Sequence, residues 1–88
     1  MTVAAETAYF LSVTLGLGKN VDSVVAPAFE HWVARSIVIS VGTVNKGAAL
    51  ESVYEVHLRP DVAPGTLVDE LNALEGVQSV AIRRQSTG

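Results

Sequence analysis

The chain has 88 residues, 49% of them hydrophobic, with no cysteine and a formal net charge of −3 at pH 7. A chain this short has room for one hydrophobic core, so we expect a single domain over residues 1–88. The lack of cysteine excludes disulfides, thiol nucleophiles and metal sites that depend on sulfur. Six basic against nine acidic residues leave no basic stripe for phosphates, so we expect no nucleic-acid partner.

No segment reaches the roughly 20 consecutive apolar residues that a membrane-spanning helix needs. The best candidate, residues 8–18, is interrupted by Ser12 and Thr14. Residues 1–7 carry Glu6 and no basic residue, whereas a signal peptide opens with positive charge. We therefore expect no direct insertion into a membrane and a cytoplasmic location.

The first predicted element is a strand over residues 7–15, where the side chains alternate between two faces. One face carries the large apolar residues Tyr9, Leu11, Val13 and Leu15. Gly16 and Gly18 end this alternation and predict a turn.

A helical periodicity follows this turn. Apolar residues recur over residues 21–33 at spacings of three and four, which predicts an amphipathic helix. Asn20 and Asp22 are both possible N-caps. Pro27 lies inside the pattern, so the helix either begins near Pro27 or bends there.

Two segments rich in β-branched or alternating residues, 36–44 and 50–59, are predicted to form an antiparallel hairpin. The connection contains Asn45, Lys46 and Gly47, and asparagine and glycine tolerate the positive φ angles that tight hairpin turns require.

The second predicted helix ends at Gly76 and has two competing starts. Thr66 with Asp69 resembles a capping box, whereas Ala63 followed by Pro64 places a proline at the first helical position. The apolar positions of this helix are Leu67, Val68, Leu71 and Leu74.

A last strand is predicted over residues 77–84, and residues 85–88 are expected to form a frayed tail. The element order β-α-β-β-α-β predicts an α+β ferredoxin-like two-layer sandwich. In this fold two helices cover one face of a four-stranded antiparallel sheet with the strand order 4-1-3-2. The side chains expected to pack between the layers are Val24, Phe29, Trp32, Leu67, Leu71 and Leu74 from the helices, and Leu11, Val13, Ile39, Tyr54, Val56 and Val80 from the strands.

The stretch from Val53 to Ile82 resembles the last β-α-β unit of ACT-like domains. It is similar in particular to the cytoplasmic tails of small bacterial membrane proteins of the MgtC and DUF4956 kinds. The shared pattern is a Tyr-Glu-Val-x-Leu strand, a helix start with proline, a Leu-x-x-Leu-x-Gly-Val helix exit and a short closing strand. The resemblance implies a non-enzymatic regulatory or assembly domain without a cofactor, located at the inner face of a bacterial membrane.

The loop after the first strand is a candidate ligand site. Gly16, Gly18, Lys19 and Asn20 lead into a helix, where glycines let backbone N–H groups approach an anion. In ACT domains the corresponding loop binds an amino acid, although the usual Asp-x-Pro-Gly turn is missing here. This loop predicts a sensor of an amino acid or an anion, and a plain strand-to-helix turn explains the same residues.

His31 is the one catalytic candidate. With Asn20 it could serve as the acid–base group of a small cofactor-free oxygenase, a class that shares this fold. The simpler interpretation is a histidine at the edge of the helix beside Trp32. His57 lies between Glu55 and Arg59, where cross-strand charge pairing explains it. The two histidines fall on different elements, so no metal site is expected.

The second strand is the candidate interface. Its residues Ile37, Val38, Ile39 and Val41 carry no charge, and the predicted topology places them at a sheet edge. Unprotected edges pair with other chains. We therefore expect a homodimer or homo-oligomer formed through this strand, or a membrane protein or larger chain as its partner.

Overall fold

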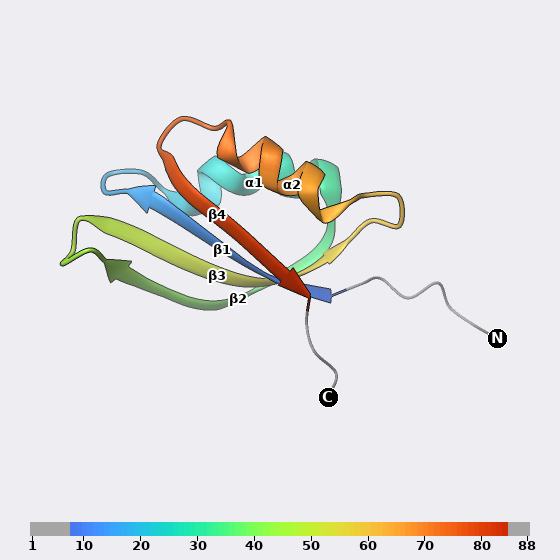
Figure 1. The fold of residues 1–88 in the computed structure, drawn as a ribbon, viewed down its shortest axis with the longest axis horizontal. Helices are drawn as coiled ribbons and strands as arrows, with labels where there is room; N and C mark the ends of the chain where they lie inside the picture. The colour runs from blue at the N-terminus through green and yellow to red at the C-terminus, as the bar shows by residue number, and fades with distance from the viewer. Residues whose placement is uncertain (1–7, 85–88) are drawn as a thin grey trace.

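The computed structural model describes residues 8–84, so Thr7 and the predicted tail 85–88 lie outside the described residues. The elements are β1 (Ala8–Gly16), α1 (Val21–Trp32), β2 (Val33–Val44), β3 (Ala49–Leu58), α2 (Pro64–Asn72) and β4 (Val77–Arg84). All strand pairs are antiparallel and the sheet order is β2-β3-β1-β4. Both helices cover the same face of the sheet (Figure 1). The predicted ferredoxin-like sandwich and its strand order are confirmed.

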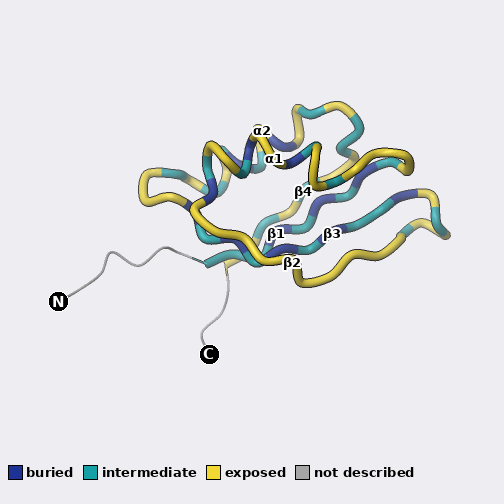
Figure 2. The backbone as a smooth tube through the Cα atoms, turned by 180° about the vertical axis from the view of Figure 1, so that it is seen from behind, coloured by how far each residue is buried: buried dark blue, intermediate teal, exposed yellow. Residues whose placement is uncertain are grey.

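The core lies between the helices and the two central strands (Figure 2). Leu11, Val13 and Leu15 on β1 are fully buried, as the alternation of the sequence predicts. The neighbouring strand β3 and the two helices complete this core. Their buried residues include Tyr54, Val56, Leu58, Val25, Ala28, Leu67 and Leu71.

α1 begins at Val21 and continues through Pro27. Asn20 is the N-cap, and its side-chain Oδ1 accepts a hydrogen bond of 3.3 Å from the N–H of Ser23. The alternative that the helix begins near Pro27 is therefore wrong. Proline lacks the N–H that would bond to the carbonyl of Ser23, but both residues are exposed, so water can reach that carbonyl.

The hairpin between β2 and β3 turns at Asn45 and Lys46, whose φ angles are 55° and 57°. The N–H of Gly47 donates to the carbonyl of Val44 at 3.1 Å. Two positive φ angles inside one such bond define a turn whose twist matches that of the paired strands. The predicted hairpin is confirmed.

α2 begins at Pro64, which occupies the first helical position after Ala63. Of the two predicted starts, the one with proline at the first helical position is observed. The fixed φ of proline suits a helix, and the N–H that proline lacks would have no helical partner at this position. The helix ends at Asn72, four residues before Gly76, and Leu74 lies in the following turn. Gly76 has a φ of +91° and leads directly into β4.

Candidate interaction site

One edge of the sheet exposes a row of apolar side chains. Ile37, Val38, Ile39 and Val41 are 58%, 53%, 50% and 54% exposed, and we refer to these four residues as the β2 edge. In Figure 2 almost the whole of β2 is exposed, whereas its neighbour β3 is buried or half-buried. The expected position of these residues at a sheet edge is confirmed, and the expected packing of Ile39 in the core is wrong.

Two register shifts in β2 explain why Ile39 leaves the core: one between Val33 and Arg35 brings Ser36 and Val38 to the helix side, and the other falls at Ile39 itself. Val38 lies opposite Tyr54 and Ser40 lies opposite Val53, so Ile39 is an extra residue with no partner on β3. The sequence prediction assumed regular alternation, which an extra residue interrupts.

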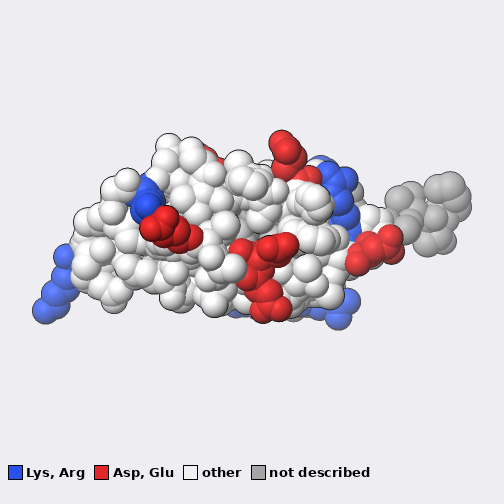
Figure 3. Space-filling model, turned by 90° about the horizontal axis from the view of Figure 1, so that it is seen from above, with Lys and Arg blue, Asp and Glu red and all other residues white. Residues whose placement is uncertain are grey.

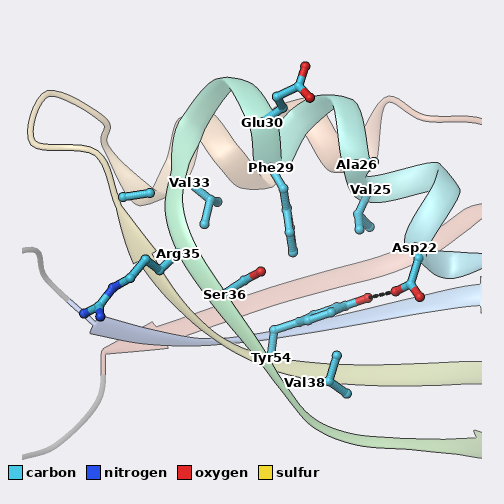
Figure 4. A pocket seen from close by; sticks show the side chains of 11 residues that line it. Asp22, Val25, Ala26, Phe29, Glu30, Val33, Arg35, Ser36, Val38 and Tyr54 are labelled. Atoms are coloured by element: carbon cyan, nitrogen blue, oxygen red, sulfur yellow. Dashed lines mark hydrogen bonds between the residues drawn. The ribbon is translucent and has the colours of Figure 1, made fainter.

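A groove runs along the helix side of the β2 edge, between α1 and β2 (Figure 4). Its volume is about 410 Å³. The ring of Phe29 points from α1 towards Tyr54 of β3, and the two rings meet edge to face at 5.1 Å. The other lining residues are Asp22, Val25, Ala26, Glu30, Val33, Ala34, Arg35, Ser36 and Val38.

One end of this groove is polar. The hydroxyl of Tyr54 donates a hydrogen bond of 3.5 Å to a carboxylate oxygen of Asp22. Burial raises the pKa of Tyr54 above its usual value of 10.0, and the negative charge of Asp22 raises it further. The tyrosine therefore remains a neutral donor at physiological pH, and it ties the start of α1 to β3.

A second hollow of about 490 Å³ lies on the other side of the same edge. It is lined by Arg35, Ser36, Ile37, Glu55 and His57. The Nε2 of His57 lies 3.0 Å from a carboxylate oxygen of Glu55 on the same strand, and Arg35 is its neighbour across the sheet. This contact joins two residues of one strand, whereas the sequence predicted pairing across strands.

Arg59 binds to the last turn of α1. Its guanidinium donates to the carbonyl of Glu30 at 3.1 Å, and its backbone N–H donates to the carbonyl of Trp32, also at 3.1 Å. These carbonyls belong to the last turn of α1, where helical partners are missing. Arg59 therefore closes the helix beside the start of β2.

The candidate ligand loop is organised by contacts within the chain. Asn20 caps α1, and the N–H of Gly16 donates to the carbonyl of Gly76 at 3.1 Å. The aliphatic part of Lys19 lies over Gly76, because a Cβ built on that glycine would meet it at 3.1–3.4 Å. Gly18 takes a positive φ of 90° at the turn. Binding of an amino acid or anion at this loop stays a prediction.

His31 is exposed in the last turn of α1 and meets the ring of Trp32 edge to face at 4.8 Å. It borders a small hollow of about 210 Å³ between the helices, together with Glu70. Asn20 lies at the opposite end of the same helix, about 16 Å away along its axis. The structure therefore does not bring together the two residues proposed for acid–base chemistry.

Charged side chains are scattered over the helix side of the molecule. On this face of the described residues, the Lys and Arg side chains form no continuous stripe (Figure 3). Within residues 8–84, no three His, Asp or Glu side chains are grouped so that they could hold a metal ion. In the same part of the chain, no helix is long and apolar enough to cross a bilayer.

Comparisons with known proteins place this geometry in a known fold. No family model matches the chain, and no curated protein matches it significantly. A solved structure does match: the solution structure of the C-terminal domain of the MgtC protein from Mycobacterium tuberculosis. The fold is similar to that of the MgtC C-terminal domain. The TM-score is 0.62, and the match covers 99% of this chain and 96% of the MgtC domain at 13% sequence identity. The resemblance to the MgtC kind is confirmed in the fold.

The α1–β2 groove was not predicted from the sequence. Asp22, Ala26 and Glu30 recur every four residues and form one rim of the groove. Such a stripe of small and charged residues is typical of a solvent-facing helix surface. The sequence feature that could have indicated the groove is the position of these residues on a helix directly before an uncharged edge strand.

Proposed function

We propose that this chain is a non-enzymatic assembly domain that associates with a second copy of itself through the β2 edge. The observation that carries the proposal is the row of four exposed apolar residues on an edge strand. No Lys, Arg, Asp, Glu or Pro occurs from Ser36 to Val44, although such residues commonly protect sheet edges from pairing.

A second copy suits this edge for two physical reasons. Antiparallel pairing of a strand with its own copy satisfies the free N–H and C=O groups of both chains with one two-fold axis. Each copy carries a formal charge of −3, so association is least opposed by repulsion where no charge is present. The β2 edge meets that condition over its whole length.

We also propose that the domain serves a regulatory role as the cytoplasmic part of a bacterial membrane protein of the MgtC kind. The likeness to the MgtC C-terminal domain and the motif of residues 53–82 support this assignment. Fractionation of cells that express the chain from its native gene tests the assignment. Recovery in the membrane fraction is the expected result, and recovery only in the soluble fraction would contradict it.

The dimer is tested by introducing a charge into the β2 edge. Val38→Lys should weaken self-association by a factor of ten or more, because a buried unpaired ammonium opposes strand pairing. Sedimentation velocity at micromolar concentrations measures the change. Leu17→Lys is the matched control, since Leu17 is 58% exposed but lies in the loop after β1.

Leu17→Lys should sediment like the wild type, and both variants should keep the wild-type circular dichroism spectrum. A wild-type chain that is monomeric over the whole concentration range would refute the proposed dimer. Equal weakening by the two lysines would show that the effect is general charge and not edge pairing.

A further inference from the structure

Two bulges, one between Val33 and Arg35 and one at Ile39, decide which side chains of β2 face the helix side of the sheet. Residues that pair directly across an antiparallel ladder point to the same face. Before the bulge at Ile39, Ser36 pairs with Val56 and Val38 pairs with Tyr54, both buried beneath the helices. After this bulge, the helix-side residue is Val41, which pairs with the buried Ser52.

This change of alternation restricts how β2 can pair with a copy of itself. Residues opposite one another must again share a face, so the helix-side residues of one half of β2 must meet the helix-side residues of the other half. Two neighbouring registers satisfy this condition: Ser36 opposite Val41, or Val38 opposite Val41. A further register shift lies between Val33 and Arg35, so the faces match only from Arg35 onward: the first register matches them over residues 35–42 and the second over residues 35–44. The length of the overlap therefore does not select the first register.

We propose that β2 pairs with β2 of a second copy in the register that sets Ser36 opposite Val41, so that Val41 of each copy closes the groove of the other. This inference rests on the proposed self-association and adds its geometry. Ser36 lines the groove, and Val41 of the second copy would lie beside it on the helix side. The site is then completed by the second copy.

The groove supplies a physical reason for this register. It is lined by the apolar side chains of Val25 and Phe29 from α1 and of Val38 from the β2 edge. Ser36 is small and leaves room for a valine from the next strand. Covering this apolar surface with Val41 removes it from water, which favours association.

Disulfide formation between copies tests the register. The chain has no native cysteine, so introduced thiols report without interference. In the double variant Ser36→Cys/Val41→Cys, the two thiols of one copy are about 16 Å apart along the strand and cannot bond to each other. The proposed register brings each within bonding distance of the other thiol on the second copy.

The expected result is a covalent dimer that forms under mild oxidation at least ten times faster than in two control variants. Val38→Cys/Val41→Cys reports the neighbouring register. Ser36→Cys/Ser40→Cys places the thiols on opposite faces, because Ser40 pairs with Val53 on the uncovered side. Each reduced variant is first compared with the wild type by sedimentation and circular dichroism.

The outcomes separate the register from the dimer itself. Faster crosslinking of either control, in a wild type that dimerises, would overturn the register and leave the proposed function standing. A monomeric wild type would overturn both. A second measurement needs no oxidation. Val41→Lys should weaken the dimer about tenfold more than Ser40→Lys does. Equal weakening by the two variants would contradict a groove closed by Val41.

Discussion

The two edges of the sheet differ in how they are protected. β4 carries Arg83 and Arg84, and the guanidinium of Arg83 lies over the ring of Phe10 at 5.3 Å. Its apolar residues Val80 and Ile82 are half-buried and pack against the core, and α2 lies against the strand. The four residues of the β2 edge lie outside the core and are uncharged. The β4 edge is protected from pairing by charged residues and a helix, whereas the β2 edge has no such protection.

The difference follows from the lengths of the elements. α1 and β2 have 12 residues each, which correspond to about 18 Å of helix and about 40 Å of strand. The chain passes directly from Trp32 at the end of α1 to Val33 at the start of β2. The helix can therefore cover only the first part of the strand.

The largest expected change in the free energy of unfolding comes from a substitution beneath α2, on the β4 side of the sheet. Leu71→Ala empties a fully buried position on α2, the helix that packs against β4, and should lower the free energy of unfolding by about 2–5 kcal/mol. Ile37→Ala on the open edge should change it by less than about 0.5 kcal/mol in the monomer. Urea denaturation at low protein concentration measures both. Similar losses would show that the two edges are equally packed.

A smaller effect is expected where the chain enters β4. Gly76→Ala should cost about 1–2 kcal/mol, because Gly76 has a positive φ and its added Cβ would press on Lys19. Gly65→Ala is the matched control, since Gly65 lies in α2 with nothing within 4 Å of its added Cβ. It should leave stability unchanged or raise it slightly. Thermal unfolding decides, and equal effects would exclude backbone strain at Gly76.

The smallest effect concerns the groove beside the open edge. Because burial and Asp22 raise the pKa of Tyr54, the folded protein keeps this proton at a pH where the unfolded chain releases it, near pH 10. The stabilisation is present below about pH 10 and is lost as the pH rises through the folded-state pKa. In Tyr54→Phe, stability should fall less steeply above about pH 10. Parallel declines of the two proteins in urea titrations would contradict this assignment.

Much of the fold could be predicted because its signals are local. Alternation marks β1 and β3, the residues Asn45 to Gly47 mark the hairpin, and the last strand was predicted with its observed limits, residues 77–84. The boundary between α1 and β2 was predicted wrongly: the helix was extended to Val33 and the strand was started at Ser36, whereas β2 begins at Val33. Val33 fits both patterns. It continues the apolar stripe of the helix and is also a buried strand residue.

The site depends on features that residue types do not specify. No residue type marks the register shifts between Val33 and Arg35 and at Ile39, so a regular alternation was assumed and Ile39 was assigned to the core. The groove arises from the unequal lengths of a helix and a strand, which matter only once both are placed in space. The exposed edge itself was predictable, because it needs only the strand order and the absence of charge between residues 36 and 44.

The pairing of Tyr9 with Arg84 brings the beginning of β1 and the end of β4 to the same end of the sheet. Any segment joined to either strand would therefore hold the domain by its β1–β4 side and leave β2 facing away from the tether. In a dimer built on β2, the two β4 strands would stand seven strand spacings apart, or roughly 34 Å. Paired domains of this kind would act as a spacer that fixes the distance between whatever their two tethers are anchored to.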